Sequence, residues 1–223
     1  MVKSLLSLKE LIYPAVCISC ERYGKAICSI CEAGWLVKCK KTKVLGIDHY
    51  FVTDYNNFSS KIILAAKEDG NKLAIKLLSI SIANSIKFAV QDRKLNKEID
   101  LVTIPSQKSA IKSRGRDHIS VLAIEVVRQL LLMEINANHL PLLEVAKISM
   151  DQSNLNSKER KENMKYAFKV SNSLNSQTGI FLIDDLITTG ASIQEGVRAL
   201  NDAKITINAI ITACAVGRNF LIR

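Results

Sequence analysis

Apolar and polar positions follow two patterns along the chain, one typical of strands and one typical of helices. Short apolar or alternating runs predict strands, and apolar residues three or four positions apart predict helices. The predicted strands lie at residues 49–55, 99–104, within 140–148, 179–184 and 204–216. The predicted helices lie at residues 58–68, 71–88, 119–133 and 193–203. Strands that alternate with helices predict an α/β fold, with a mainly parallel sheet flanked by helices.

Two polar segments interrupt this pattern. Residues 106–118 are polar and basic, and we expect a loop there. Residues 150–167 are charged and contain neither Gly nor Pro, which is compatible with a mobile loop or a solvated helix. Basic side chains in both segments are available to an anionic ligand, although a solvated basic surface would show the same composition.

Five of the six cysteines fall between Cys17 and Cys39, and their spacing predicts a metal site. Two CxxC pairs supply four thiolates, Cys17 with Cys20 and Cys28 with Cys31, which can close a tetrahedral zinc shell. A closed shell leaves no open coordination position, so we expect a structural zinc. We therefore divide the chain into a zinc-binding module at residues 1–45 and a larger domain at residues 46–223. Cys39 is expected to be a spare ligand or a free thiol.

Composition narrows the class of protein further. Apolar residues make up 48% of the chain, which excludes a globally disordered protein. No uninterrupted apolar run reaches about 18 residues, and no small-residue cleavage site follows the first apolar patch. We therefore expect a cytoplasmic protein without membrane insertion. The net charge of +10 permits a polyanionic partner. Lysines near Cys39, with Tyr23 and Trp35, could hold single-stranded nucleic acid, or the module could be a purely structural cap.

The predicted strand at residues 179–184 leads into a segment suited to a phosphorylated sugar. Two carboxylates at its carboxyl end can accept hydrogen bonds from ribose hydroxyls or help to hold Mg²⁺. The following turn and helix N-terminus offer hydroxyls, backbone N–H groups and a flexible glycine to a phosphate. These residues are Asp184, Asp185, Thr188, Thr189, Gly190, Ala191 and Ser192. No GxxxxGK[ST] sequence is present, so this is not a P-loop.

This segment, IFLIDDLITTGAS, resembles the phosphoribosyl-pyrophosphate (PRPP) motif of type I phosphoribosyltransferases. The resemblance implies that fold, with Asp184 and Asp185 as catalytic acids on the ribose. It implies that the loop of Thr188 to Ser192 holds the 5′-phosphate, with Mg²⁺ bound alongside PRPP. It also places the pyrophosphate near the residues that follow the strand at 99–104, for which Pro105, Lys108 and Arg114 are the candidates.

The whole chain is similar to the ComF family of competence-associated proteins, which pair this domain with a small zinc-ribbon-like module. The opening LIYPAVCISC, the Arg114–Gly115 pair and a set of scattered positions carry this similarity. Those positions are Gln152, Leu155, Arg160 and Asn163. The chain departs from the family at residues 116–118, where Arg-Asp-His replaces an aromatic residue and two amides, and Ser192 replaces the more usual Thr.

The similarity implies a protein that binds PRPP, transfers or hydrolyses its phosphoribosyl group, and serves DNA uptake in natural competence. Single-stranded DNA and competence helicase-type proteins are the implied partners. The alternative is a non-catalytic accessory protein that senses PRPP and binds single-stranded DNA. The sequence does not define a pocket for an acceptor substrate.

Overall fold

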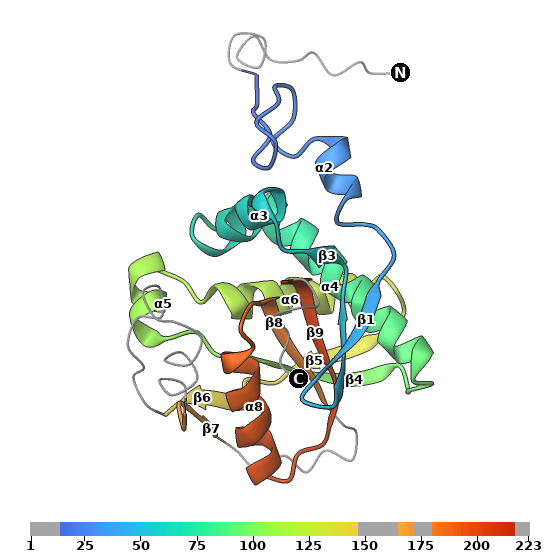
Figure 1. The fold of residues 1–223 in the computed structure, drawn as a ribbon, viewed down its shortest axis with the longest axis vertical. Coiled ribbons are helices and arrows are strands. Elements are labelled where there is room, and N and C mark those ends of the chain that lie inside the picture. The colour runs from blue at the N-terminus through green and yellow to red at the C-terminus, as the bar shows by residue number, and fades with distance from the viewer. Residues whose placement is uncertain (1–13, 147–164, 172–179, 217–223) are drawn as a thin grey trace.

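The computed structural model describes residues 14–146, 165–171 and 180–216. The helices of the described residues are α2 (Ser29–Ala33), α3 (Asn57–Lys67), α4 (Lys72–Asp92), α5 (Lys108–Arg114), α6 (His118–Leu131) and α8 (Ala191–Asp202). The strands are β1 (Lys40–Val44), β2 (Ile47–Phe51), β3 (Thr53–Asp54), β4 (Glu98–Thr103), β5 (Asn136–His139), β6 (Leu143–Val145), β7 (Phe168–Val170), β8 (Ile180–Ile187) and β9 (Ile207–Ala215). Figure 1 shows their arrangement.

A seven-stranded sheet forms the centre of the described chain, in the order β1-β2-β9-β8-β4-β5, with β3 also paired to β9. All neighbours are parallel except β1 and β2, which form an antiparallel pair. A separate antiparallel pair, β6 and β7, lies beside α8. The predicted α/β fold with a mainly parallel sheet flanked by helices is therefore confirmed.

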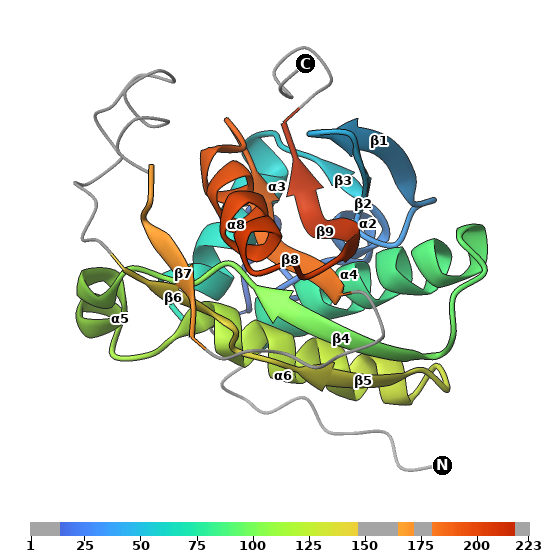
Figure 2. The ribbon, with the colours of Figure 1, turned by 90° about the horizontal axis from the view of Figure 1, so that it is seen from below.

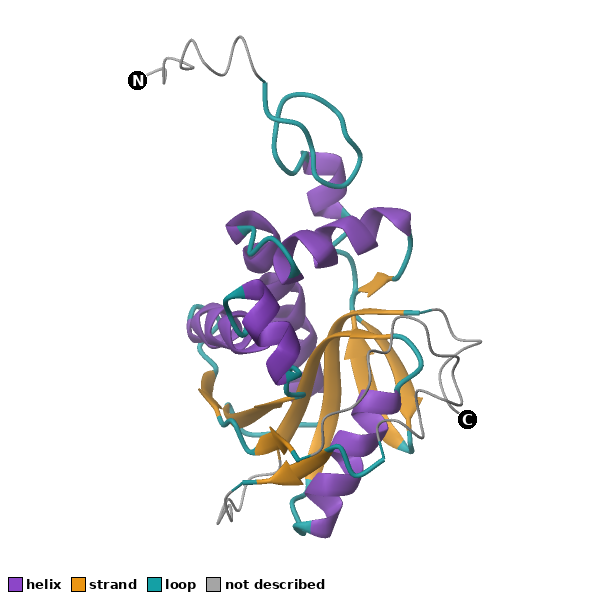
Figure 3. Ribbon diagram, turned by 90° about the vertical axis from the view of Figure 1, so that its left-hand side faces the viewer, coloured by secondary structure: helices purple, strands orange, loops and turns teal. Residues whose placement is uncertain are grey.

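Helices cover both faces of this sheet, and the alternation of side chains along each strand creates two cores. On β8, Phe181 and Ile183 belong to the core under α3, α4 and α6, whereas Ile180 and Leu182 belong to the core under α8. Figures 2 and 3 show α4 and α6 on one face and α8 on the other. Because β8 is buried on both faces, its apolar run is continuous, as expected of a central parallel strand.

The helix α4 is the longest helix of the described residues and is largely apolar. By length and composition it could cross a membrane, but 61% of its apolar window is buried inside the structure. It packs against α6, β9 and α3. Packing within the core accounts for its apolar sequence.

The cysteine-bearing segment rests on the N-terminal end of α3. Ser19 Oγ donates a hydrogen bond to the Phe58 carbonyl at 3.1 Å, and Lys61 Nζ lies 2.5 Å from Glu21 Oε1. Thr53 Oγ1 donates to the Gly34 carbonyl at 3.0 Å. The sheet itself begins with β1, which pairs with β2 from Lys40 onward. The division of the chain at residue 45 stays a prediction, and β1 belongs to the sheet.

The structure differs from the sequence prediction in several elements: α2, β1 and β7 were not predicted, and three further differences follow. Residues 108–114, expected to form part of a loop, make the short helix α5. A polar strand, β5, was not predicted, because its residues alternate between exposed and half-buried positions at the edge of the sheet. The strand β8 continues past the two aspartates to Ile187, since these residues pair with β9. The acid pair is therefore part of the sheet and not of the following loop.

Candidate functional site

The order of the strands predicts where a ligand would bind. From β4 the chain crosses to β5 on one side, and from β8 it crosses to β9 on the other side. In open parallel sheets, such a switch point opens a crevice at the carboxyl ends of the two central strands. A cleft of about 660 Å³ lies there, and it is lined by residues that follow β4 and by residues at the end of β8. This volume lies within the usual range of small-molecule sites.

The two aspartates of β8 stand at the floor of this cleft. Asp185 is buried, and one of its carboxylate oxygens, Oδ2, lies 3.6 Å from Lys67 Nζ and 3.4 Å from His118 Nε2. The backbone N–H of Asp185 donates to Asp184 Oδ1 at 2.9 Å. The strand therefore fixes both carboxylates, and α3 and α6 supply the groups that face Asp185.

The two carboxyl groups have opposite electrostatic environments. Burial and the neighbouring charge of Asp185 raise the pKa of Asp184 well above its usual value. Burial would also raise the pKa of Asp185, but the charge of Lys67 and the close contact with His118 outweigh it and lower that pKa. In return, the charge of Asp185 raises the pKa of Lys67. The cleft thus holds one firmly ionised carboxylate beside one that takes up a proton readily.

The opposite wall of the cleft comes from the loop after β4 and from α5. Pro105, Ser106 and Arg114 line it. Arg114 Nε donates to Glu68 Oε2 at 2.7 Å, and Ser106 Oγ lies 3.2 Å from His118 Nδ1. His118 therefore contacts both this wall and the floor, since its other nitrogen faces Asp185. It occupies one of the three positions where the sequence departs from the ComF pattern.

The other two departing residues have structural contacts. The guanidinium of Arg116 lies over Gly70, whose φ is +64°, and donates to the Lys67 carbonyl at 3.0 Å. A side chain on Gly70 would meet this guanidinium at 2.7 Å. Asp117 precedes α6 and accepts a hydrogen bond from Ser120 Oγ at 2.6 Å. Arg116 thus ties the turn between α3 and α4 to the segment that carries Arg114.

The loop after β8 has the geometry expected of a phosphate cradle. Gly190 has a φ of +74° and directly precedes α8, so its left-handed conformation turns the chain into the helix. Thr188 and Ser192 line the cleft at this end. Thr189, Gly190 and Ala191 complete the segment but are not among the described residues that line the cleft, whereas Thr188 and Ser192 lie in the same cleft as the acids.

The structure brings most of the predicted PRPP residues together, and their roles stay predictions. Pro105, Arg114, Asp184 and Asp185 line the cleft with Thr188 and Ser192. Lys108, at the exposed start of α5, is not among the lining residues of the described chain. The ComF-like positions at 152, 155, 160 and 163 lie outside the described residues.

Two residues of the cleft were not found from the sequence. Lys67 and Glu68 stand at the end of α3, and both line the cleft. In the sequence they are ordinary charged residues at the end of an amphipathic helix, and no local motif marks them. Only the tertiary packing of α3 against the switch point brings them there.

The cysteine cluster has the geometry of a metal site. The sulfur atoms of Cys17, Cys20, Cys28 and Cys31 all lie within 4.8 Å of one another. Cys20 Sγ and Cys28 Sγ are 3.6 Å apart, close to the roughly 3.8 Å edge of a tetrahedron with Zn–S bonds of about 2.3 Å. Burial would raise the pKa of Cys17, but backbone hydrogen bonds from Cys20 and Cys28 lower it to about 6. These four thiols therefore fit a structural metal ion such as zinc.

The other two cysteines stand apart from this cluster. Cys39 packs against the core, with its Sγ 3.6 Å from Ser85 Oγ, and burial raises the pKa of its thiol. Cys214 is fully buried in β9, so it belongs to the core. Among the described residues, the metal-binding cluster contains neither of them.

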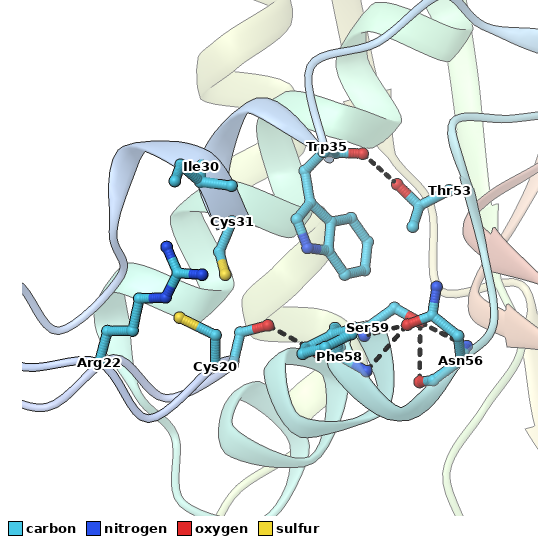
Figure 4. Close-up of a pocket in the computed structure, with 11 residues that line it drawn as sticks. Cys20, Arg22, Ile30, Cys31, Trp35, Thr53, Asn56, Phe58 and Ser59 are labelled. Carbon is cyan, nitrogen blue, oxygen red and sulfur yellow. Dashed lines mark hydrogen bonds between the residues drawn. The ribbon is translucent and has the colours of Figure 1, made fainter.

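A second pocket, of about 310 Å³, lies between the cysteine segment and α3. Trp35, Phe58 and Arg22 line it together with Cys20 and Cys31, and Figure 4 shows the Trp35 side chain directed between the two segments. Trp35 itself is buried, so it is not an exposed stacking platform.

The lysines after Cys39 are partly engaged within the protein. Lys40 Nζ lies 2.5 Å from Asp54 Oδ2, and Lys41 Nζ lies 2.6 Å from Asp92 Oδ2. Lys43 is exposed on β1. A polyanion would compete with these ion pairs for Lys40 and Lys41.

The fold and the two sites define the class of molecule. It is an α/β protein with a ligand cleft at the carboxyl edge of a parallel sheet and a four-cysteine segment before the sheet. The chain is a distant homologue of the competence protein ComFC of Streptococcus pneumoniae. The two are 26% identical over 191 residues, which cover 82% of this chain and 78% of that protein. This homology confirms the resemblance to ComF proteins. No protein-family model matches the chain.

Two solved structures are similar to the chain at low identity. One is adenine phosphoribosyltransferase from Saccharomyces cerevisiae complexed with an imino-altritol bisphosphate and adenine, at 10% identity and a TM-score of 0.39. That match covers 87% of this chain and 92% of the enzyme. The other is adenine phosphoribosyl transferase from Trypanosoma brucei in complex with AMP, pyrophosphate and ribose-5-phosphate, at 9% identity and a TM-score of 0.40. It covers 82% of this chain and 91% of the enzyme.

Proposed function

We propose that the cleft at the ends of β4 and β8 binds PRPP. The observation that carries this proposal is the placement of the acid pair on β8 directly before the glycine-led N-terminus of α8. Carboxylates accept hydrogen bonds from ribose hydroxyls, and the N–H groups and hydroxyls after them bind the 5′-phosphate. The wall at Ser106 and Arg114 then faces the pyrophosphate.

Magnesium fits this arrangement as a partner of PRPP. Mg²⁺ is usually held by one or two carboxylates together with substrate phosphates. Asp185 Oδ2 is a buried carboxylate oxygen that has ion-pair contacts with Lys67 and His118 but no well-directed hydrogen bond among the described residues, and Asp184 stands beside it. Bound Mg²⁺ would offset negative charge on the pyrophosphate. Asp184 and Asp185 would orient the ribose, and Arg114 would stabilise the leaving group.

The reaction we propose is transfer or hydrolysis of the phosphoribosyl group, with release of pyrophosphate. The alternative function for the same cleft is that of a non-catalytic protein that binds PRPP as a signal. The homology to ComFC supports a role in DNA uptake for either reading, with competence helicase-type proteins as partners in the cytoplasm.

Isothermal titration calorimetry with PRPP and Mg²⁺ tests this proposal. We expect Asp184→Asn and Asp185→Asn each to weaken PRPP binding by about 10-fold or more, since hydrogen bonds to charged groups contribute about 1.5–3 kcal/mol. Asp202→Asn, at the far end of α8, is the matched control and should bind like the unaltered protein. Absence of PRPP binding by the unaltered protein would overturn the proposal.

Turnover separates the enzyme from the sensor. Release of pyrophosphate from PRPP, with and without candidate nucleobase acceptors, is the measurement. Turnover that Asp184→Asn abolishes identifies an enzyme. Binding without turnover supports the non-catalytic reading.

A second candidate function is the binding of single-stranded DNA by the cysteine segment. The observation that favours it is the pocket lined by Trp35, Phe58 and Arg22, beside the strongly exposed Tyr23. Aromatic side chains with nearby cations hold single strands by stacking and by phosphate contacts. In a gel shift with oligo-dT, Tyr23→Ala with Phe58→Ala should weaken binding, and Tyr166→Ala, an exposed tyrosine beside β7, should not. Equal shifts for both variants would reject this function.

A further inference from the structure

Arg114, the cation on the pyrophosphate wall, is not free in the structure. Its Nε donates to Glu68 Oε2 at 2.7 Å. The guanidinium side chain is 15% exposed and the Glu68 side chain is 45% exposed, so the pair lies at the mouth of the cleft. The hydrogen bond to Arg114 is also the main cause that lowers the pKa of Glu68. The Arg114 side chain thus already has a carboxylate partner.

The end of α3 places one charged side chain against the floor of the cleft and another against the opposite wall. Lys67 faces Asp185 on the floor, and the next residue, Glu68, faces Arg114 on the opposite wall. Arg116 fixes this end of α3 by its hydrogen bond to the Lys67 carbonyl. The contact between Glu68 and Arg114 therefore belongs to a fixed junction between α3 and α5.

The backbone of Arg114 is held independently of its side chain. Arg116 Nη1 donates to the Arg114 carbonyl at 3.3 Å, and Gly115 follows in a left-handed conformation with φ of +67°. The Arg114 side chain can therefore change its partner while the backbone stays in place. Besides Glu68, its Nη1 lies 3.4 Å from His118 Nδ1, which is a weak contact.

We propose that Glu68 is an affinity-determining residue that competes with pyrophosphate for Arg114. A pyrophosphate group must displace the Glu68 carboxylate to form a bidentate contact with the guanidinium. The carboxylate also adds a negative charge at the mouth of a cleft that accepts an anion. Both effects weaken the binding of ligands that carry pyrophosphate. The first does not act on ribose-5-phosphate, which has no pyrophosphate group to take Arg114 from Glu68. This inference rests on the proposed PRPP site.

The test measures the binding of inorganic pyrophosphate and of PRPP, each with Mg²⁺, by calorimetry. Glu68→Gln removes the charge and Glu68→Ala removes the contact as well. We expect each to tighten pyrophosphate and PRPP binding by about three- to tenfold, the range of a partly exposed ion pair. The gain should shrink as the salt concentration rises. Ribose-5-phosphate, which lacks the pyrophosphate, should bind with little change.

Two variants separate this effect from a general change in charge. Asp69→Asn makes the same change of charge one residue away, on an exposed side chain, and should leave the affinity unchanged. In the double variant Glu68→Gln with Arg114→Gln, the gain should disappear, because it depends on the freed guanidinium.

The outcomes also separate this inference from the proposed function. If the unaltered protein binds PRPP and the Glu68 variants bind pyrophosphate no tighter than it does, the proposal that Glu68 competes for Arg114 is wrong. The proposal of a PRPP site is then unaffected. An equal gain in Asp69→Asn, or a gain that persists without Arg114, overturns the proposal for Glu68 in the same way. If no variant binds either ligand, the inference falls together with the proposed function.

Discussion

At the residue scale, the environment of a side chain decides its chemistry more than its type does. Asp184 and Asp185 are neighbours in the chain, but Lys67 and His118 face only the second of them. The sequence indicated a pair of acids and their place at a strand end. It did not indicate that one pKa is raised and the other lowered, because Lys67 comes from the helix α3, far away in the sequence.

The buried His49 carries a prediction about stability and pH. It is fully buried, with Nε2 2.8 Å from Thr212 Oγ1, and burial lowers its pKa to about 3. In the unfolded chain the ring takes up a proton near pH 6.5, and in the folded chain only near pH 3. The free energy of unfolding should therefore fall as the pH falls from 6.5 toward 3, by up to about 1.4 kcal/mol per pH unit.

Urea unfolding between pH 7.5 and pH 5 measures this effect. In the His49→Gln variant, the free energy of unfolding should depend less steeply on pH. The remaining pH dependence should be the part that comes from the carboxylates. Identical slopes in the two proteins would show that His49 is protonated in the folded state.

At the element scale, helices and strands with a strong apolar periodicity could be predicted from the sequence. Short elements at the edge of the fold could not. The apolar runs of β4, β8 and β9 and the helical spacing of α3, α4, α6 and α8 are where the sequence placed them. The misses include α5, a short helix with no buried residue, and β5, a polar edge strand. Both are fixed by contacts with distant elements, which a local pattern does not contain.

The start of α3 allows a test of how firmly this helix is held. Asn56 accepts hydrogen bonds from the backbone N–H groups of Phe58 and Ser59, and Ser59 Oγ accepts one from the Asn56 N–H. Asn56→Ala should lower the free energy of unfolding by about 1 kcal/mol, the usual contribution of such a cap. Asn57→Ala changes the next residue, also an exposed asparagine, and should have a smaller effect in chemical denaturation. Equal losses of unfolding free energy in the two variants would mean that the cap formed by Asn56 does not stabilise the helix.

At the scale of the whole molecule, the cysteine segment and the sheet differ in what stabilises them. The sheet and its helices bury two apolar cores. Between residues 14 and 36, the buried apolar residues of the structure are Cys17 and Trp35. We therefore expect a metal ion bound by the four thiols to give this segment its fixed structure.

Removal of the metal should therefore unfold the cysteine segment and leave the sheet and its helices folded. Elemental analysis should find about one zinc per chain. Chelation, or Cys20→Ser with Cys28→Ser, should expose Trp35, the single tryptophan, and shift its fluorescence to longer wavelength. The far-UV circular dichroism of the sheet and helices should change little. A cooperative loss of both signals would show that the segment and the sheet unfold as one unit.

The position of β9 in the sheet has a consequence for the synthesis of the protein. This strand lies between β8 and β2, so among the described residues β1 and β2 join the rest of the sheet only through it. The bond between His49 and Thr212 spans 163 positions. On the ribosome, the hairpin of β1 and β2 emerges long before β9. The edge of β2 that pairs with β9 therefore stays unpaired until β9 has been made. The two halves of the sheet can join only after nearly all of the described chain has been translated.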